Sequence, residues 1–170
     1  MGVQSDARNQ TLPVHAAIAM GSNLGDREQT LRSAVAAIAA LPMTAVVATS
    51  RLHETAPVGP GVQGMYLNAC VRVATCLTPR GLLAALLRIE MAHGRDRSSQ
   101  QRWGPRTLDL DLLLFGDVVM HDESAAPYLT LPHPRMCERL FVLQPLAEVW
   151  PDAVVAGKPI HDQIAALRTV

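Results

Sequence analysis

The segment that most constrains this chain is a mostly apolar run with two aspartates, LDLDLLLF at residues 108–115. Its composition predicts a largely buried β-strand. Successive side chains of a strand point to opposite faces, so Asp109 and Asp111 share one face, and the other face carries Leu108, Leu110 and Leu112. An ionised carboxylate is costly to bury unless a cation meets it. The strand therefore predicts a cationic partner for its two acidic side chains.

The residues just before this strand offer such cations. Arg102 and Arg106 flank the string WGP, which begins with Trp103. Two carboxylates about 7 Å apart along a strand can converge on a divalent cation, and Mg2+ is commonly held by one or two carboxylates plus substrate phosphates. Arginine suits phosphate because its planar guanidinium presents several donors. For the two aspartates alone, a structural Arg–Asp pair at a sheet edge is an equal alternative.

Composition limits the classes of protein to consider. A chain of 170 residues, 49% hydrophobic and 18% charged, is typical of one globular domain. The formal net charge is zero, which argues against a general nucleic-acid or membrane binder but allows one local basic site. No apolar run approaches the roughly 18 residues of a membrane span. Lys158 is the only lysine, so a phosphate site must be built mainly from arginine.

The cysteines and the N-terminus indicate a cytoplasmic protein. Cys70, Cys76 and Cys137 show neither metal-site nor disulfide spacing, so we expect reduced and mostly buried thiols. Residues 1–14 are polar and lack the apolar centre of a signal peptide, which predicts a flexible extension. Residues 15–170 are expected to form a single domain.

Hydrophobic periodicity predicts alternating strands and helices. Asp26 can cap a first helix that Pro42 ends, and Thr78 followed by Pro79 predicts the start of a second. A helix over 137–149 is expected to bend or end near Pro145. The order β-α-β-β-α-β is ferredoxin-like, an α+β fold in which an antiparallel sheet carries helices on both faces in three layers. Strands are predicted at 15–20, 43–55, 66–75 and 108–115, a hairpin at 116–120, an irregular segment at 127–136, and a final helix at 161–167.

A polar loop over residues 94–106 is the first further candidate site. It carries four arginines against one acid, Asp96, and could close over a substrate's phosphates. A solvated basic loop is the alternative, although Trp103 in such a loop favours a bound partner. The chain has neither a Walker A motif nor GxGxxG, so arginines and a metal would have to replace a glycine cradle.

The second candidate site is the face of strand 66–75 that lies opposite its apolar side. A ring at Tyr66 beside the amide of Asn68 suits a flat polar heterocycle, with Phe141 as a possible opposing ring. The alternatives are a solvated face for the first two and a core position for Phe141. His133 could bind a phosphate or the backbone, and Glu90 could face a nucleotide or solvent. No nucleophile–base pair is evident, which disfavours covalent catalysis.

Over residues 15–155 the chain resembles the 6-hydroxymethyl-7,8-dihydropterin pyrophosphokinase family of folate biosynthesis. The resemblance implies an enzyme that moves the terminal diphosphate of ATP to the pterin hydroxymethyl group and releases AMP. The motifs that carry it are GSNLGD (21–26), YLNA (66–69), GRDR (94–97), RWGPRTLDLDLLLF (102–115), LPHPRM (131–136) and ERLFVLQPL (138–146).

The resemblance also implies a set of site residues. Asp109 and Asp111 would hold two Mg2+ ions, and Arg95 and Arg106 would complete the catalytic group by clamping the phosphates. ATP, the co-substrate, would contact Glu90, Arg97, Trp103, Leu112, His133 and Arg139. The pterin would contact Thr55, Ala56, Val58, Gly59, Tyr66, Asn68 and Phe141. We expect a cytoplasmic monomer whose partners are these small molecules, with no nucleic acid or membrane.

Two other function classes are compatible with parts of the sequence. A metal-dependent nuclease or sugar transferase could use the two aspartates, but the set of Tyr66, Asn68 and Phe141 has no role there. A ferredoxin-like RNA-binding domain is the non-enzymatic alternative. The six aromatic residues do not form the stacking pattern on adjacent strands that such domains use.

Overall fold

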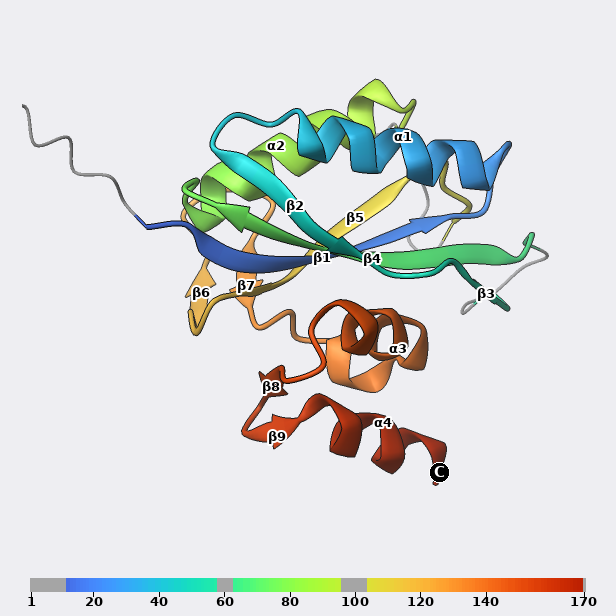
Figure 1. Ribbon diagram of the computed structural model, residues 1–170. Coiled ribbons are helices and arrows are strands. Elements are labelled where there is room, and N and C mark those ends of the chain that lie inside the picture. The colour runs from blue at the N-terminus through green and yellow to red at the C-terminus, as the bar shows by residue number, and fades with distance from the viewer. Residues whose placement is uncertain (1–11, 58–62, 96–103, 170) are drawn as a thin grey trace, which may run out of the picture.

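The structure is a computed structural model that describes residues 12–57, 63–95 and 104–169. Its centre is an antiparallel sheet with the strand order β2-β4-β1-β5, in which β3 also pairs with β4 (Figure 1). The strands of this sheet are β1 (Val14–Ser22), β2 (Thr44–Thr49), β3 (His53–Thr55), β4 (Tyr66–Thr75) and β5 (Asp109–Phe115).

Helices cover both faces of the sheet, as Figure 1 shows. Helices α1 (Arg27–Ala39) and α2 (Pro79–Ala92) lie on one face, and α3 (Leu140–Val149) and α4 (Ile160–Arg168) lie on the other. Neighbouring strand residues therefore enter different cores. On β1, Ile18 packs under α1 and α2, whereas Ala17 packs against α3 and α4. The predicted α+β class, with an antiparallel sheet and packed helices, is confirmed.

Both predicted helix starts are confirmed by their caps. Asp26 Oδ1 accepts the backbone N–H of Gln29 at 3.0 Å, and Thr78 Oγ1 accepts that of Gly81 at 3.0 Å. Each bond satisfies an N–H that has no partner within the first helical turn. Pro79 is the first residue of α2, where a missing N–H costs nothing.

The single strand predicted over 43–55 is wrong, because the structure has two strands there. Thr49 pairs with Val71 and His53 pairs with Asn68, so the β2–β3 segment has one residue more than β4 between the two pairs. Ser50 absorbs the irregularity: its N–H donates to the Cys70 carbonyl and its Oγ accepts the Cys70 N–H, both at 2.9 Å. This break gives β3 its own direction beside β4.

Three further boundaries differ from prediction. The segment 116–120 does not fold back on β5; instead β6 (Met120–Asp122) pairs with β7 (Leu129–Leu131), which lies in the stretch expected to be irregular. A 3-10 turn, η1 (Met136–Glu138), precedes α3, so the helix begins at Leu140. The helix ends at Val149 as predicted, so the alternative that it ends near Pro145 is wrong, whereas a bend at this buried proline stays a prediction.

The ends of the described chain add two details. Strand β1 begins at Val14, the last residue of the predicted extension, and residues 1–11 lie outside the described residues. A small hairpin of β8 (Val154–Val155) and β9 (Lys158–Pro159) precedes α4. None of the helices in the described ranges has the length and apolar character needed to cross a bilayer.

Candidate active site

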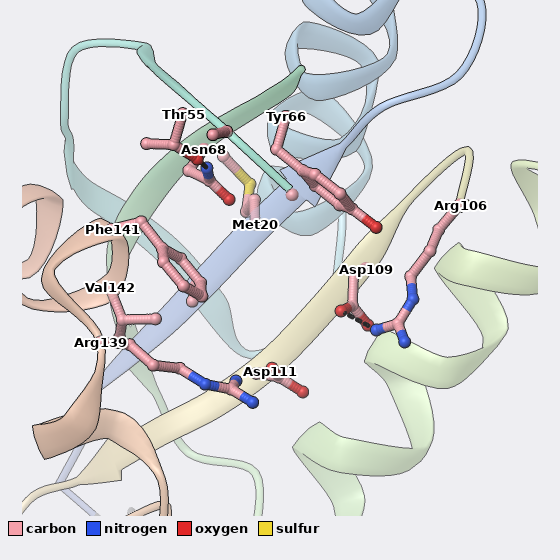
Figure 2. A pocket seen from close by; sticks show the side chains of 13 residues that line it. Met20, Thr55, Tyr66, Asn68, Arg106, Asp109, Asp111, Arg139, Phe141 and Val142 are labelled. Carbon is pink, nitrogen blue, oxygen red and sulfur yellow. Dashed lines mark hydrogen bonds and ion pairs between the residues drawn. The ribbon is translucent and has the colours of Figure 1, made fainter. Parts of the chain in front are cut away.

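A pocket opens on the face of the sheet that α3 covers, next to β3 (Figure 2). Strands β4, β1 and β5 form its floor, since Asn68, Gly21 and Asp109 pair across the sheet in one row. A Cβ atom on Gly21 would lie 3.2 Å from Asn68 Oδ1 and 4.0 Å from Asp109 Cβ. The glycine therefore leaves open the space between the amide and the carboxylate. The lining residues are Ala19, Met20, Gly21, Thr55, Ala56, Tyr66, Asn68, Arg106, Asp109, Asp111, Arg139, Phe141 and Val142.

Asp109 is ion-paired through both carboxylate oxygens. Arg95 Nη1 contacts Oδ1, and Arg106 Nη1 contacts Oδ2. Burial by itself would raise the pKa of Asp109, but the positive charges of the two arginines outweigh it and hold this pKa below its ordinary value. Asp109 is thus a stable anion at neutral pH. The predicted cationic partners of this strand are confirmed for Asp109.

Asp111 has a different environment on the same strand face. No hydrogen bond or ion pair joins it to another described residue, although it lines the pocket. Burial and the negative charge of Asp109 raise its pKa, while the charges of His133 and Arg139 act in the opposite direction. The Asp111 carboxylate therefore faces the pocket with its oxygens available to a cation.

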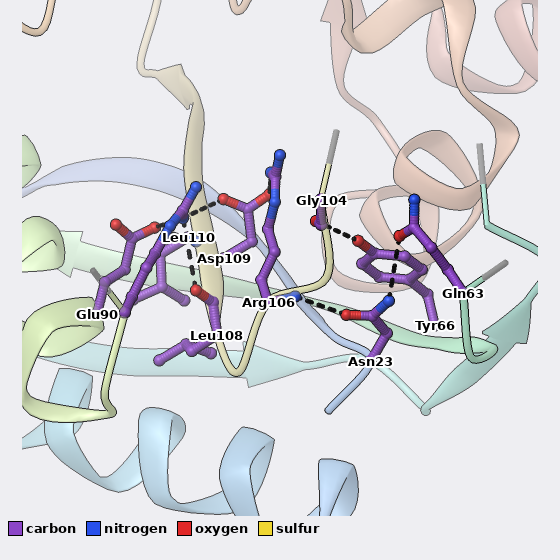
Figure 3. A network of polar contacts seen from close by, with 10 residues as sticks. Asn23, Gln63, Tyr66, Glu90, Gly104, Arg106, Leu108, Asp109 and Leu110 are labelled. Carbon is purple, nitrogen blue, oxygen red and sulfur yellow. Dashed lines mark hydrogen bonds and ion pairs between the residues drawn. The ribbon is translucent and has the colours of Figure 1, made fainter. Parts of the chain in front are cut away.

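Glu90 lies behind β5 and connects Arg95 to the backbone of that strand. It is 1% exposed, so the alternative that it faces solvent is wrong. Its carboxylate accepts the backbone N–H of Leu110 at 2.7 Å and forms an ion pair with Arg95 (Figure 3). Arg95 is thereby fixed between the end of α2 and β5, from where it reaches Asp109.

The residues predicted to surround a flat heterocycle come together in the pocket. Asn68, only 6% exposed, donates through Nδ2 to Thr55 Oγ1 at 2.8 Å, so the solvated face considered for it is wrong. Tyr66 and Phe141 approach the pocket from opposite sides, from β4 and α3 respectively (Figure 2). Ala56 completes this end. The arrangement leaves Asn68 Oδ1 as an acceptor beside two rings.

Among the predicted nucleotide contacts that lie in the described part of the chain, Arg139 alone lines the pocket. Its guanidinium carbon lies 5.7 Å from the centroid of the Phe141 ring. His133 is half-buried, and burial lowers the pKa of its imidazole. Its backbone N–H donates to the Leu113 carbonyl at 2.9 Å. Leu112 is packed in the core under α1 and α2, not in the pocket. Four predicted site residues, Val58, Gly59, Arg97 and Trp103, lie outside the described residues.

Asn23 is a site residue that the sequence did not reveal. Its Oδ1 accepts the Arg106 backbone N–H at 2.7 Å and its own N–H donates to the Arg106 carbonyl at 3.1 Å (Figure 3). Its Nδ2 lies 3.4 Å from Gln63 Oε1. Asparagine in a Gly- and Ser-rich turn is ordinary in sequence terms. What distinguishes Asn23 from an ordinary turn asparagine is its burial, since it is only 6% exposed. That burial results from contact with Arg106, 83 residues away, so the local sequence does not reveal it.

The donor types of the pocket fit Mg2+ and phosphate. Two carboxylates on one strand face supply the oxygen ligands that Mg2+ prefers, and it usually completes its coordination with water and phosphate oxygens. Arg106 and Arg139 add guanidinium donors beside Asp111. An apolar and aromatic end and a charged end therefore share one pocket.

Comparison with known proteins identifies a family with these features. Residues 17–151 match the family model described as 7,8-dihydro-6-hydroxymethylpterin-pyrophosphokinase (HPPK). A curated relative from Methylorubrum extorquens, named 2-amino-4-hydroxy-6-hydroxymethyldihydropteridine pyrophosphokinase, is 44% identical over 152 residues, covering 89% of this chain and 92% of the relative. A Bacillus subtilis protein of the same name is 48% identical over 134 residues, covering 79% of this chain and 77% of its own length.

Solved structures show the same fold at low identity. A Plasmodium falciparum HPPK-DHPS crystal structure with pterin and p-hydroxybenzoate aligns with a TM-score of 0.73 at 13% identity. The alignment covers 92% of this chain but only 44% of that longer chain. A second such structure, with pteroate, gives a TM-score of 0.71 over 93% of this chain and 44% of its own. These similarities establish the fold.

Proposed function

This chain belongs to the 7,8-dihydro-6-hydroxymethylpterin-pyrophosphokinase family, and we propose that it transfers the β,γ-diphosphate of ATP to the hydroxymethyl group of 6-hydroxymethyl-7,8-dihydropterin. AMP is the second product, and the reaction belongs to folate biosynthesis. One observation carries the proposal: a single pocket combines the Tyr66–Asn68–Phe141 end with the arginine–aspartate end. A diphosphate transfer to a heterocyclic alcohol needs both.

The pterin occupies the aromatic end. Its flat ring stacks between Tyr66 and Phe141. Asn68 donates one N–H of its amide to Thr55, which fixes the amide so that Oδ1 accepts from the amino or ring N–H groups of the pterin. The Thr55 hydroxyl accepts from Asn68 and keeps its own hydrogen for donation. Backbone groups of Ala56, and of Val58 and Gly59 beyond the described residues, are proposed to read the rest of the pterin edge.

The triphosphate of ATP occupies the charged end. Asp109 and Asp111 would hold Mg2+, for which the family resemblance implies two ions, and the metal when bound would supply positive charge against the phosphates. Arg106 and Arg139 donate to phosphate oxygens from the pocket wall, and Arg95 does so from behind Asp109. Contacts of ATP with Glu90, Arg97, Trp103, Leu112 and His133 stay predictions.

The protein's contribution to the reaction is positioning and charge stabilisation. The pterin hydroxymethyl oxygen releases its proton to water and forms a bond to the β-phosphorus of ATP, the bond from that phosphorus to the bridging oxygen of the α-phosphate breaks, and AMP leaves with the electron pair. Negative charge grows on the transferred and leaving oxygens, where Arg106 and Arg95 stabilise it. Removing one such donor typically costs about 10²–10³ in rate. No covalent enzyme intermediate is needed.

The finer architecture is part of the same proposal. We propose a ferredoxin-like topology with two split β-α-β units, which the strand order β2-β4-β1-β5 supports. Residues 15–170 form one domain that acts as a cytoplasmic monomer on its two small-molecule substrates. A nuclease or sugar transferase has no use for the Tyr66–Asn68–Phe141 set, and the few aromatic residues do not form the stacking pattern on adjacent strands that an RNA-binding domain uses.

Product analysis tests this function. Purified protein is incubated with ATP, Mg2+ and reduced hydroxymethylpterin, and the nucleotides are then separated. We expect AMP to form only when both pterin and metal are present. ADP as the product, or hydrolysis without pterin, would contradict diphosphate transfer.

A further inference from the structure

A carboxylate outside the pocket joins two of the pocket's walls. Glu148, in the last turn of α3, accepts the backbone N–H of Arg51 through Oε2 at 2.9 Å. Its other oxygen, Oε1, lies 3.0 Å from Nε2 of His53, the first residue of β3. The Arg51 guanidinium adds an ion pair of 2.8 Å. We call these contacts the α3–β3 clasp.

The clasp lies alongside the pocket. His53 and Thr55 are two residues apart on β3, so both side chains point to the same side of that strand. Phe141 and Glu148 are seven residues apart, two turns of α3, and share one face of the helix. The same two elements thus come together twice: directly where His53 meets Glu148, and at the pterin pocket, which both Thr55 and Phe141 line.

Apart from these contacts, the last turn of α3 is an unfavourable position for Glu148, so the contacts are needed to stabilise its carboxylate there. A carboxylate in the last turn of a helix is disfavoured by the helix dipole. Although partial burial would raise the pKa of Glu148, hydrogen bonds from the Arg51 side chain and backbone lower it, so the group is an anion. An anion can only accept, so His53 Nε2 carries the proton in their hydrogen bond.

Strand β3 depends on such a support. It is three residues long, and its pairing within the described sheet is with β4. The Arg51 side chain is 84% exposed, and a pair of that kind contributes little. The backbone N–H of Arg51 and the ring of His53, whose side chain is 21% exposed, are therefore the donors that fix β3 to α3.

We propose that Glu148 is a positioning residue that sets the width of the pterin pocket by holding β3 at a fixed distance from α3. The inference rests on the proposed function, because it takes the ligand of this pocket to be the pterin. It predicts that loss of the clasp weakens pterin binding, while Asp109, Asp111 and Arg106, which belong to β5 and the segment just before it, keep their geometry.

The test compares Glu148→Ala with a matched control, Arg51→Ala. The first removes all three contacts, whereas the second removes the exposed guanidinium and keeps the backbone N–H. Pterin Kd is measured with a non-hydrolysable ATP analogue and Mg2+ present, and KM for each substrate and kcat are measured separately. For Glu148→Ala we expect pterin Kd and KM to rise about tenfold, the size of one lost charge-assisted hydrogen bond. KM for ATP, kcat and all constants of Arg51→Ala should stay within about twofold.

His53 supplies a second route to the same answer, which also applies if Glu148→Ala does not fold. His53→Ala should raise the pterin Kd similarly, and His53→Gln, which keeps a side-chain N–H donor, should restore most of the affinity. A double variant that combines Glu148→Ala with His53→Ala should lose little more pterin affinity than either single variant, because both changes remove the same contact.

Distinct results would overturn the inference and the function. If Glu148→Ala and His53→Ala bind the pterin as well as wild-type protein does, the positioning role is refuted and the proposed function is untouched. Equal losses in pterin KM, ATP KM and kcat would also refute it, since they indicate a general structural role. Wild-type protein that binds no pterin would refute the proposed function and the inference together.

Discussion

Asn23 and Arg106 form a reciprocal pair: the Asn23 amide oxygen accepts the Arg106 N–H at 2.7 Å, and the Asn23 N–H donates to the Arg106 carbonyl at 3.1 Å. This pair attaches the segment before β5 to the end of β1. It fixes the backbone from which the Arg106 guanidinium reaches Asp109.

We therefore predict that Asn23→Ala lowers kcat about 10–100-fold, below the full loss expected for one phosphate donor. Asn23→Asp, which keeps an acceptor at the same place, should retain more activity than Asn23→Ala. Steady-state kinetics with both substrates varied would measure the effect. If Asn23 acts through Arg106, adding Asn23→Ala to an Arg106→Ala protein should cost little more. Full additivity of the two losses would contradict this link.

The two aspartates of β5 should respond differently to removal. Asp109→Ala leaves the Arg95 and Arg106 charges without their shared anion, which should lower the free energy of unfolding by about 1–3 kcal/mol after allowance for partial exposure. Asp111→Ala removes a carboxylate that has no ion pair in the described structure and that Asp109 repels, so stability should stay equal or rise.

Both variants should lose turnover. Thermal or urea unfolding without metal would reveal the difference in stability, and the shift in Tm on adding Mg2+ and ATP should shrink in each. Near-normal turnover in either variant would remove that residue from the proposed metal site.

The Arg80–Asp122 pair predicts a pH-dependent contribution to stability. Arg80 donates to Asp122 at 2.6 Å and also to the Pro127 carbonyl at 2.8 Å, which joins α2 to the β6–β7 hairpin. Hydrogen bonds from Arg80 and Ser124 hold the pKa of Asp122 well below its usual range. A lowered native pKa stabilises the fold above the unfolded-state pKa, and that stability is lost as pH falls through the native pKa.

Asp122→Asn should therefore have a lower Tm than wild type at pH 7, and the difference should narrow below about pH 4. Scanning calorimetry of both proteins across this range would test the sign. A difference that grows on acidification would contradict the assignment.

Burial predicts an unreactive thiol at Cys70. Burial in the core under α3 raises the pKa of Cys70 to about 12, so almost no thiolate exists near neutral pH. In native protein at pH 8, a thiol reagent should modify Cys70 far more slowly than Cys76, which is only partly buried. Peptide mapping after timed labelling distinguishes them, and labelling in urea should equalise the rates. Equal rates in the native state would indicate that this core opens readily.

The parts of the site that sequence predicted are those set by local geometry. The period of a strand places Asp109 with Asp111, and Tyr66 with Asn68, without knowledge of the rest of the chain. Both pairs line the pocket. The helix starts at Asp26 and Thr78 were predictable for the same reason, since a cap involves residues within one turn.

The parts that were missed depend on partners distant in sequence. Glu90 has no neighbouring residue that reveals its burial, because Arg95 and the Leu110 N–H meet it only after α2 packs on β5. The break at Ser50 follows from its two bonds to Cys70, 20 residues away. Asn23 and Glu148 act through contacts 83 and 97 residues away.

The fate of the β-phosphorus tests the central claim most directly. The protein is given ATP labelled at the β-phosphate, together with Mg2+ and reduced hydroxymethylpterin, and the products are separated. Diphosphate transfer predicts that the label leaves the nucleotide and appears with the pterin, in equal amount to unlabelled AMP. Label retained in ADP, with only the γ-phosphate on the pterin, would contradict the account.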